Sequence, residues 1–139
     1  MADDVRVTVE KIAGRARASS GSPWEPLVGY SRAVRSGNLI AVSGTVGINA
    51  DGSYPSTAGD QARRALAIIR TALEALGGRL DDVVRTRMFV TDIASFDEVG
   101  RAHGEVFGFI RPATSMVEVS RLVDDAALVE IEADAVVQG

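Results

Sequence analysis

Carboxylates and arginines supply most of the chemistry available to this chain of 139 residues. It has no cysteine and a single histidine, His103, which excludes thiol nucleophiles, disulfides and zinc sites that need two histidines. We expect neither a metal site nor a cofactor. The main candidates are Glu130 and Arg87, because a carboxylate can orient a water or act as a general base and a guanidinium can hold an anion. His103 lies in an apolar helical stripe, so we expect it to be a packed side chain.

Two predicted strands must position these candidates. Alternation of polarity over residues 82–91 places Arg87 and Phe89 on one face of a strand. In the last strand of the chain, Glu130 and Glu132 share one face and the apolar residues share the other. One interpretation is that both glutamates are solvated or paired with arginines, and the other is that Glu130 acts on a bound ligand.

The remaining pattern predicts an α+β fold in one domain spanning residues 1–139. Apolar residues at three- and four-residue steps predict a helix from Thr57 to Leu76, capped by Thr57 and ended by Gly77-Gly78. A second helix is expected to start at Ser95, with the Ser95 hydroxyl as its cap. Two helices on one face of a six-stranded mixed sheet would make a two-layer sandwich. The six strands are expected at residues 5–12, 29–35, 38–44, 82–91, 113–121 and 127–136, and residues 13–28 are expected to form a loop.

The composition disfavours several kinds of partner. The 15 Lys and Arg against 19 Asp and Glu leave a net charge of −4 without a basic stripe, which argues against nucleic acid. No apolar run approaches the roughly 20 residues that a membrane helix needs. The chain begins Met-Ala-Asp-Asp, without the basic and apolar regions of a signal peptide. We therefore expect a cytoplasmic protein with no membrane partner.

Five segments between Tyr30 and Ala135, in order and with matching spacing, resemble the Rid family, also called the YjgF family. The founding members of this family are reactive-intermediate (enamine and imine) deaminases. The segments are residues 37–44 (GNLIAVSG), 82–92 (DVVRTRMFVTD), 112–115 (PATS), 117–122 (VEVSRL) and 129–133 (VEIEA).

The resemblance implies a chorismate-mutase-like fold assembled as a homotrimer, in which three sheets line a central barrel. It also implies that a small carboxylate-bearing ligand binds in three clefts between subunits, where a glutamate and backbone groups orient the water that hydrolyses an imine. By position in the motifs, the glutamate is Glu130, and the cleft is closed by Tyr30, Ser43, Gly44 and Phe89.

One family residue is replaced in this chain. The motif Pro-Ala-Arg-Ser, whose arginine clamps the ligand carboxylate, here has Thr114 at the third position, and the glutamine that usually follows Ser-Gly is Thr45. Threonine offers one neutral hydrogen bond in place of a charged fork, and such a loss in a partly dry cleft weakens binding by about 2–5 kcal/mol. We expect Thr114 to line the ligand site without clamping a carboxylate. We hypothesise that Arg87 replaces the clamp and pairs with Glu130 when the site is empty.

These observations favour a trimer that binds a small metabolite in intersubunit clefts, and that is not an ordinary 2-iminoacid deaminase. If it is an enzyme, it hydrolyses an imine, an enamine or a related C–N bond. The alternative is a non-catalytic ligand-binding or regulatory trimer. The acidic charge and the single histidine disfavour an endoribonuclease or translation inhibitor. The scarcity of candidate cations disfavours a chorismate mutase, whose substrate is a dianion, and a shared fold does not carry that function.

Overall fold

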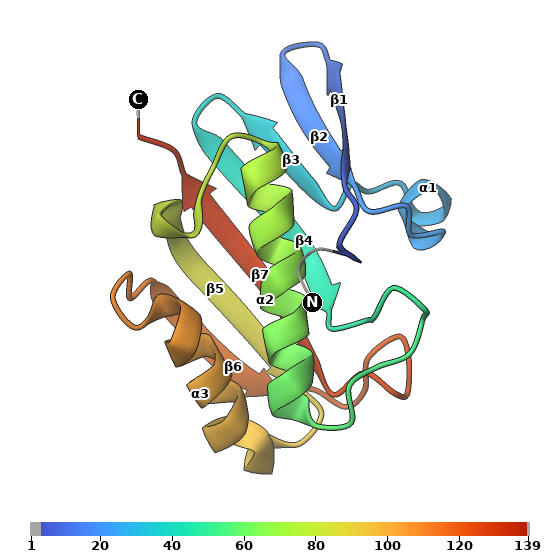
Figure 1. The fold of residues 1–139 in the computed structure, drawn as a ribbon, viewed down its shortest axis with the longest axis vertical. Helices are drawn as coiled ribbons and strands as arrows, with labels where there is room; N and C mark the ends of the chain where they lie inside the picture. The colour runs from blue at the N-terminus through green and yellow to red at the C-terminus, as the bar shows by residue number, and fades with distance from the viewer. Residues whose placement is uncertain (1–3, 139) are drawn as a thin grey trace.

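The computed structural model describes residues 4–138 and confirms an α+β fold in which helices cover one face of a single sheet (Figure 1). The first residues of the chain, on which the expectation of no signal peptide rests, lie outside the described part. The sheet order is β1-β2-β3-β4-β7-β5-β6, with β5 and β6 parallel and all other neighbours antiparallel. The strands are β1 (Thr8–Ile12), β2 (Arg15–Ser19), β3 (Ala33–Ser36), β4 (Leu39–Val46), β5 (Val83–Val90), β6 (Ala113–Glu118) and β7 (Val129–Val136). The helices are α1 (Trp24–Val28), α2 (Ala58–Ala75) and α3 (Phe96–Phe107), with 3-10 turns η2 (Leu80–Asp82) and η3 (Ile93–Ser95).

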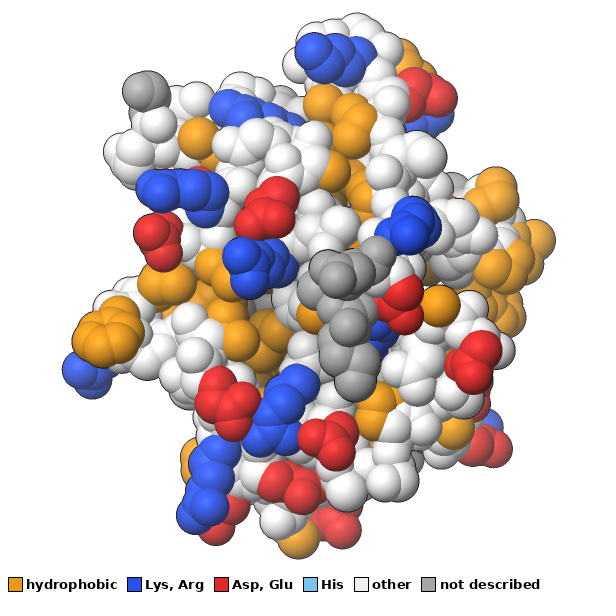
Figure 2. Space-filling view, viewed as in Figure 1, with side chains coloured by type: hydrophobic (Ala, Val, Ile, Leu, Met, Phe, Trp, Pro, Cys, Tyr) orange, Lys and Arg blue, Asp and Glu red, His pale blue; other side chains and the backbone are white. Residues whose placement is uncertain are grey.

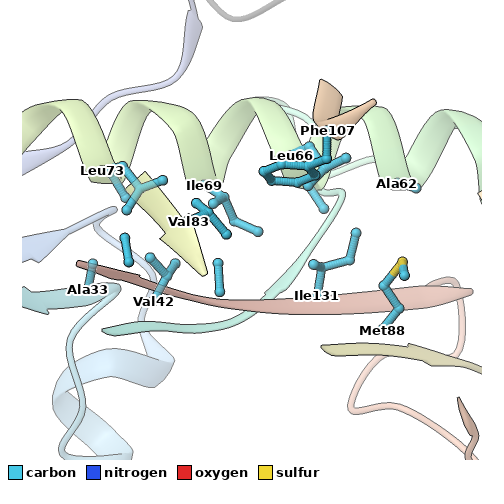
Figure 3. Close-up of a cluster of buried hydrophobic side chains, with 14 of the residues drawn as sticks. Ala33, Val42, Ala62, Leu66, Ile69, Leu73, Val83, Met88, Phe107 and Ile131 are labelled. Carbon is cyan, nitrogen blue, oxygen red and sulfur yellow. The ribbon is translucent and has the colours of Figure 1, made fainter. Parts of the chain in front are cut away.

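Helix α2 lies across the middle of the sheet and supplies most of the core. Leu66, Ile69 and Leu73 are at most 2% exposed, because residues three and four apart fall on one side of a helix. They point down onto side chains of β4 and β7 that include Val42 and Ile131 (Figure 3). This core occupies only the helix side of the sheet.

Both ends of α2 are as predicted. The Thr57 hydroxyl accepts a hydrogen bond from the Asp60 N–H at 3.1 Å, which satisfies one of the free donors of the first turn. At the other end, Gly77 adopts a φ of 82°, and the Gly78 N–H donates to the Leu73 carbonyl at 2.8 Å.

The sheet has seven strands instead of six, because part of the predicted loop 13–28 is ordered. Residues 15–19 form β2, which pairs with β1 on one side and β3 on the other. Ala13 and Gly14, with φ of 49° and 81°, turn the chain between β1 and β2. The apolar positions in the alternating pattern of β2 hold small residues, of which Ala18 is fully buried. Alanine is a weak strand former, so this strand lacks the usual pattern of branched residues.

Helix α3 starts differently from the prediction. Ser95 makes no side-chain capping hydrogen bond. Instead Asp92 accepts from the Ala94 N–H at 2.9 Å and caps the η3 turn that leads into α3. The capping residue is thus Asp92, one 3-10 turn before the predicted Ser95. The helical spacing of apolar residues does not distinguish a 3-10 start from an α-helical start.

The outer side of the helices is charged, whereas α1 is apolar. Acidic and basic side chains mix over α2 and α3 in Figure 2, and the apolar group at the right-hand edge of that view lies over α1. Trp24, Leu27 and Val28 of α1 are 50%, 75% and 68% exposed.

The opposite face of the sheet carries no helix of residues 4–138. Alternation turns polar and apolar side chains together onto this open face, including Arg87, Glu132, Leu39 and Val117. Leu39 and Val117 are 49% and 46% exposed. Among the described helices, none is both long enough and apolar enough to cross a membrane. The cytoplasmic location stays a prediction.

Candidate functional site

A β-bulge in β4 places Ser43 and Gly44 at the centre of the candidate site. The register of β4 against β7 shifts at these two residues, so they leave the regular ladder. The Ser43 N–H donates to the Arg32 carbonyl at 3.0 Å, and its hydroxyl donates to the Ser31 carbonyl at 2.6 Å. The bulge therefore presents the Ser-Gly backbone in one fixed arrangement.

Glu130 of β7 lies directly against Gly44. A Cβ atom on Gly44 would lie 2.8 Å from Glu130 Cδ and 3.3 Å from Cγ, closer than side chains tolerate. The role of glycine here is to allow this close approach of the Glu130 side chain. A left-handed backbone conformation is not the reason for it, because the φ of Gly44 lies outside that region. The pairing of β5 with β7 sets Phe89 opposite Glu130 on the same face. Three of the predicted site residues thus come together.

The surroundings of Glu130 favour its protonated form. Burial raises the pKa of the Glu130 carboxyl, the neighbouring Glu132 raises it further, and the positive charge of Arg32 opposes the rise. A pKa shifted toward neutral suits a group that must both accept and return a proton. This is the electrostatic signature of a candidate general base.

Arg32 is the cation of this site, and sequence reasoning missed it. The side chain is 7% exposed, and its Nη1 donates to the Gly44 carbonyl at 2.8 Å and to Thr45 Oγ1 at 2.9 Å. Its Nη2 lies 3.4 Å from the Tyr30 hydroxyl, and its Nε is buried without a partner. Arg32 fixes the carbonyl next to Glu130 and brings Tyr30 to the same place. The two-residue spacing of Tyr30 and Arg32 within the predicted strand 29–35 was the signal that could have found it.

Two loops complete the surroundings of Glu130. Tyr54 lies in the loop before α2, and burial, Asp124 and Glu130 together raise the pKa of its hydroxyl. Gln61 of α2 is 1% exposed and ties this loop to the one before β7. Its Nε2 donates to the carbonyls of Pro55 and Ala126 at 2.9 Å each, and its Oε1 accepts from the Leu128 N–H at 2.8 Å.

Arg87 does not pair with Glu130, so the hypothesised contact is wrong. Its Nη1 lies 3.3 Å from Glu132 and 3.2 Å from Asp134 on the open face. The reason is register, because the residue opposite Arg87 in β7 is Glu132, whereas Glu130 faces Phe89. The spacing along one strand did not fix which partner lies across from it. Binding of ligand by Arg87 stays a prediction.

Thr114 lies on the helix side of the sheet, away from the face that carries Glu130 and Arg87. It is paired in parallel register with Thr86, and the two hydroxyls are 2.7 Å apart. Thr86 Oγ1 is also 2.8 Å from His103 Nε2. The prediction that His103 is a packed and hydrogen-bonded side chain is confirmed. Within one copy of the chain, Thr114 and Glu130 cannot approach the same ligand atom.

The arrangement provides a base, a fixed backbone and a buried positive charge. Glu130 can hold and activate a water, while the Ser43-Gly44 backbone and Tyr30 offer hydrogen-bonding groups around it. No cluster of three or more His, Asp or Glu side chains in residues 4–138 is arranged to hold a metal ion. These groups suit the polar addition of water to a small unsaturated substrate.

The motifs and the fold agree with one family. Residues 21–137 match the family model described as Endoribonuclease L-PSP. The chain belongs to this family, also called the YjgF or Rid family. The resemblance inferred from the five sequence segments is therefore confirmed.

Relatives in the YjgF family include proteins with assigned activities and solved structures. The chain is 37% identical to the 2-iminobutanoate/2-iminopropanoate deaminase of Escherichia coli, over 77% of this chain and 86% of that protein. A crystal structure of a YjgF/YER057c/UK114 family member from Mycobacterium tuberculosis is 51% identical, with a TM-score of 0.82, covering 88% of this chain and 99% of that one. The E. coli family member TdcF, solved with bound serine, is 29% identical, with a TM-score of 0.74, covering 78% of this chain and 88% of that one.

Proposed function

We propose that this YjgF-family chain forms a homotrimer that hydrolyses the C–N bond of a small imine, enamine or related metabolite in clefts between subunits. The observation that carries the proposal is the packing of Glu130 on Gly44, beside the buried charge of Arg32. Tyr30, Ser43 and Phe89 are the other candidate residues around Glu130. The similarity to a deaminase of 2-imino acids supports the reaction type.

In the proposed reaction Glu130 takes a proton from water as the water oxygen attacks the imine carbon. The C=N π electrons move to nitrogen, and Glu130 passes its proton to that nitrogen to give a carbinolamine. Glu130 then takes the proton of the carbinolamine hydroxyl and delivers it to the amine nitrogen as the C–N bond breaks, so that a carbonyl compound and ammonia leave. The raised pKa of Glu130 supports both halves of this cycle.

Assembly is supported by the distribution of exposed groups. The open face carries half-exposed apolar side chains such as Leu39 and Val117, and β6 is an edge strand whose free side is unpaired. A cleft between subunits is also consistent with the sheet of one copy, in which Thr114 and Glu130 lie on opposite faces. Thr114 of one subunit can share a ligand only with Glu130 of another subunit. Sedimentation at micromolar concentration is expected to give about three times 14.6 kDa.

Thr114 favours a substrate different from an ordinary 2-imino acid. It stands where the family motif places the carboxylate-clamping arginine, and it carries no charge. The same observation favours the second candidate function, a trimer that binds a metabolite without turning it over. The two candidate functions are distinguished by whether the protein shows turnover that depends on Glu130.

The test is hydrolysis of imines produced in situ, 2-iminobutyrate by an amino-acid oxidase and neutral imines by an amine oxidase, followed by trapping of the imine that remains. Neutral imines and enamines are compared with 2-iminobutyrate. We expect acceleration for a neutral substrate, little for 2-iminobutyrate, and loss of the acceleration in Glu130→Gln. Robust activity on 2-iminobutyrate would refute the substrate argument, and ligand binding without any Glu130-dependent turnover would favour the non-catalytic trimer.

A further inference from the structure

Three hydrogen-bonding groups in series link α3 to the edge strand β6 through a buried residue of β5. His103 Nε2 lies 2.8 Å from Thr86 Oγ1, which lies 2.7 Å from Thr114 Oγ1. Thr86 is fully buried, His103 is half-buried, and Thr114 is exposed. The only imidazole in the sequence is thus linked to the exposed Thr114 hydroxyl through the buried hydroxyl of Thr86.

The tautomer of the imidazole sets the direction in which hydrogen bonds are donated along this series of three groups. Each hydroxyl has one proton to donate, so the three groups must donate in the same sense. When Nε2 carries the proton, Thr86 donates to Thr114 and the Thr114 proton points outward. When Nε2 is bare, both hydroxyls donate inward and Thr114 presents only a lone pair. Burial lowers the pKa of His103, which favours the neutral ring that this switch requires.

The group at the exposed end of this hydrogen-bonded series, the Thr114 hydroxyl, is uncharged. The arginines nearest to Thr114 in register are Arg85, opposite Ala113, and Arg87, opposite Ser115. Neighbouring positions of a strand face opposite sides, so both guanidiniums lie across the sheet from the Thr114 hydroxyl. A hydroxyl that donates or accepts on demand complements a neutral carbonyl or amide group better than it complements a carboxylate.

We infer that Thr114, backed by Thr86 and His103, is a specificity residue that binds a neutral amide or carbonyl group of the ligand. Assigning that group to the substrate rests on the proposed function. The hydrogen-bonded chain itself lies in one copy of the protein and requires no turnover. Its expected consequence is that ligand binding at Thr114 changes the tautomer balance of a ring two hydrogen bonds away.

The experiment uses the single histidine as the reporter. In untagged ¹⁵N-labelled protein, the two ring nitrogens of His103 report the tautomer directly, and acetamide and acetate serve as probes of equal size. We expect acetamide to move the ring resonances saturably and to bind at least five-fold tighter than acetate. Thr114→Val should abolish the response, and Thr86→Val should abolish the response of His103. Ser115→Ala, which removes the next hydroxyl on the same strand, is the matched control and should leave the response unchanged.

Other outcomes overturn the inference. These are equal or tighter binding of acetate, no response to acetamide, a response that survives Thr114→Val, or one that is lost in Ser115→Ala. Melting temperatures confirm that each variant is folded, and if Thr86→Val does not fold, Thr114→Val decides alone. If acetamide acts through Thr114 but no imine is hydrolysed, only the proposed function fails. Imine hydrolysis without an acetamide response removes only this inference.

Discussion

Replacing Gly44 by alanine tests whether close packing on the β4 backbone holds Glu130. The new methyl carbon would lie 2.8 Å from Glu130 Cδ, whereas unstrained carbon atoms lie about 3.5–4.0 Å apart. The carboxyl group must therefore retreat by roughly 1 Å. Because a flexible side chain can give way, the fold should survive with a loss of about 1 kcal/mol in the free energy of unfolding, at the low end for overpacking.

A double-mutant cycle isolates this clash without any assay of activity. Urea unfolding is measured for the wild type, Gly44→Ala, Glu130→Ala and the double variant. In the Glu130→Ala background the obstructing atoms are gone, so Gly44→Ala should have almost no effect. The coupling free energy should be about 1 kcal/mol. An equal loss in both backgrounds would show that the glycine serves some other purpose and would refute the packing argument.

The same substitution should also reduce any turnover that depends on Glu130. A displacement of about 1 Å in a catalytic group can lower the rate about 10²-fold. We therefore expect kcat/KM for the neutral imine to fall by about that factor while the trimer persists. Gly104→Ala in α3 is the control glycine substitution, since its new methyl group would meet no atom within 4 Å beyond its chain neighbours and the nearby backbone of its own helix. Unchanged turnover in Gly44→Ala would contradict the placement of Glu130 at the reaction.

Three further predictions concern stability. Gly104→Ala should raise the free energy of unfolding by about 0.5–1 kcal/mol through helix propensity, measured by urea unfolding, and a loss would reveal a contact that the fold does not show. Burial alone would raise the pKa of Glu25, but hydrogen bonds from Ser20 and Ser19 outweigh it and hold the pKa below its usual value. Its contribution is therefore present above the unfolded pKa and is lost as pH falls through the folded one, so Glu25→Gln should lower the melting temperature at pH 7, and the gap should close below about pH 4. Glu130 has the opposite sign, because a raised pKa means that stability is lost as pH rises through it. Glu130→Gln should accordingly melt higher than the wild type at pH 7 but not below about pH 4, and matching pH profiles for the Glu25 and Glu130 variants would contradict one of the two assignments.

Periodicity was sufficient for the parts of the fold in which large apolar residues recur. The stripe of α2 and the alternation of β7 predicted both elements, and Gly77 marked the end of the helix. Periodicity failed at β2, where Ala18 is buried and Ala16 is partly buried, because small side chains leave little contrast between the two faces. The strand is held mainly by backbone pairing with its two neighbours, which a one-dimensional pattern does not reveal.

The candidate site was predicted only where motifs name residues one by one. The motifs gave Glu130, Gly44 and Tyr30 as candidates in this way, and the structure places them near one another. Arg32 was missed because most of its partners are backbone and hydroxyl oxygens, so nothing in its neighbours' charges singles it out. The partner of Arg87 was wrong because the register between β5 and β7 depends on bulges in the ladder, which residue spacing within one strand does not fix.

Gln61 has a consequence for engineering new specificities. All three of its side-chain hydrogen bonds end on backbone atoms of the two loops, at Pro55, Ala126 and Leu128. The loop bases are therefore held through backbone atoms, whereas the tips are held by hydrogen bonds of Asn49, Asp51, Ser53 and Asp124 and by the left-handed φ of Gly52. A library that randomises residues 50 and 121–123 but retains these residues and Gln61 should remain folded in most of its members. Such a library would change the rim beside Glu130 without moving Glu130 itself.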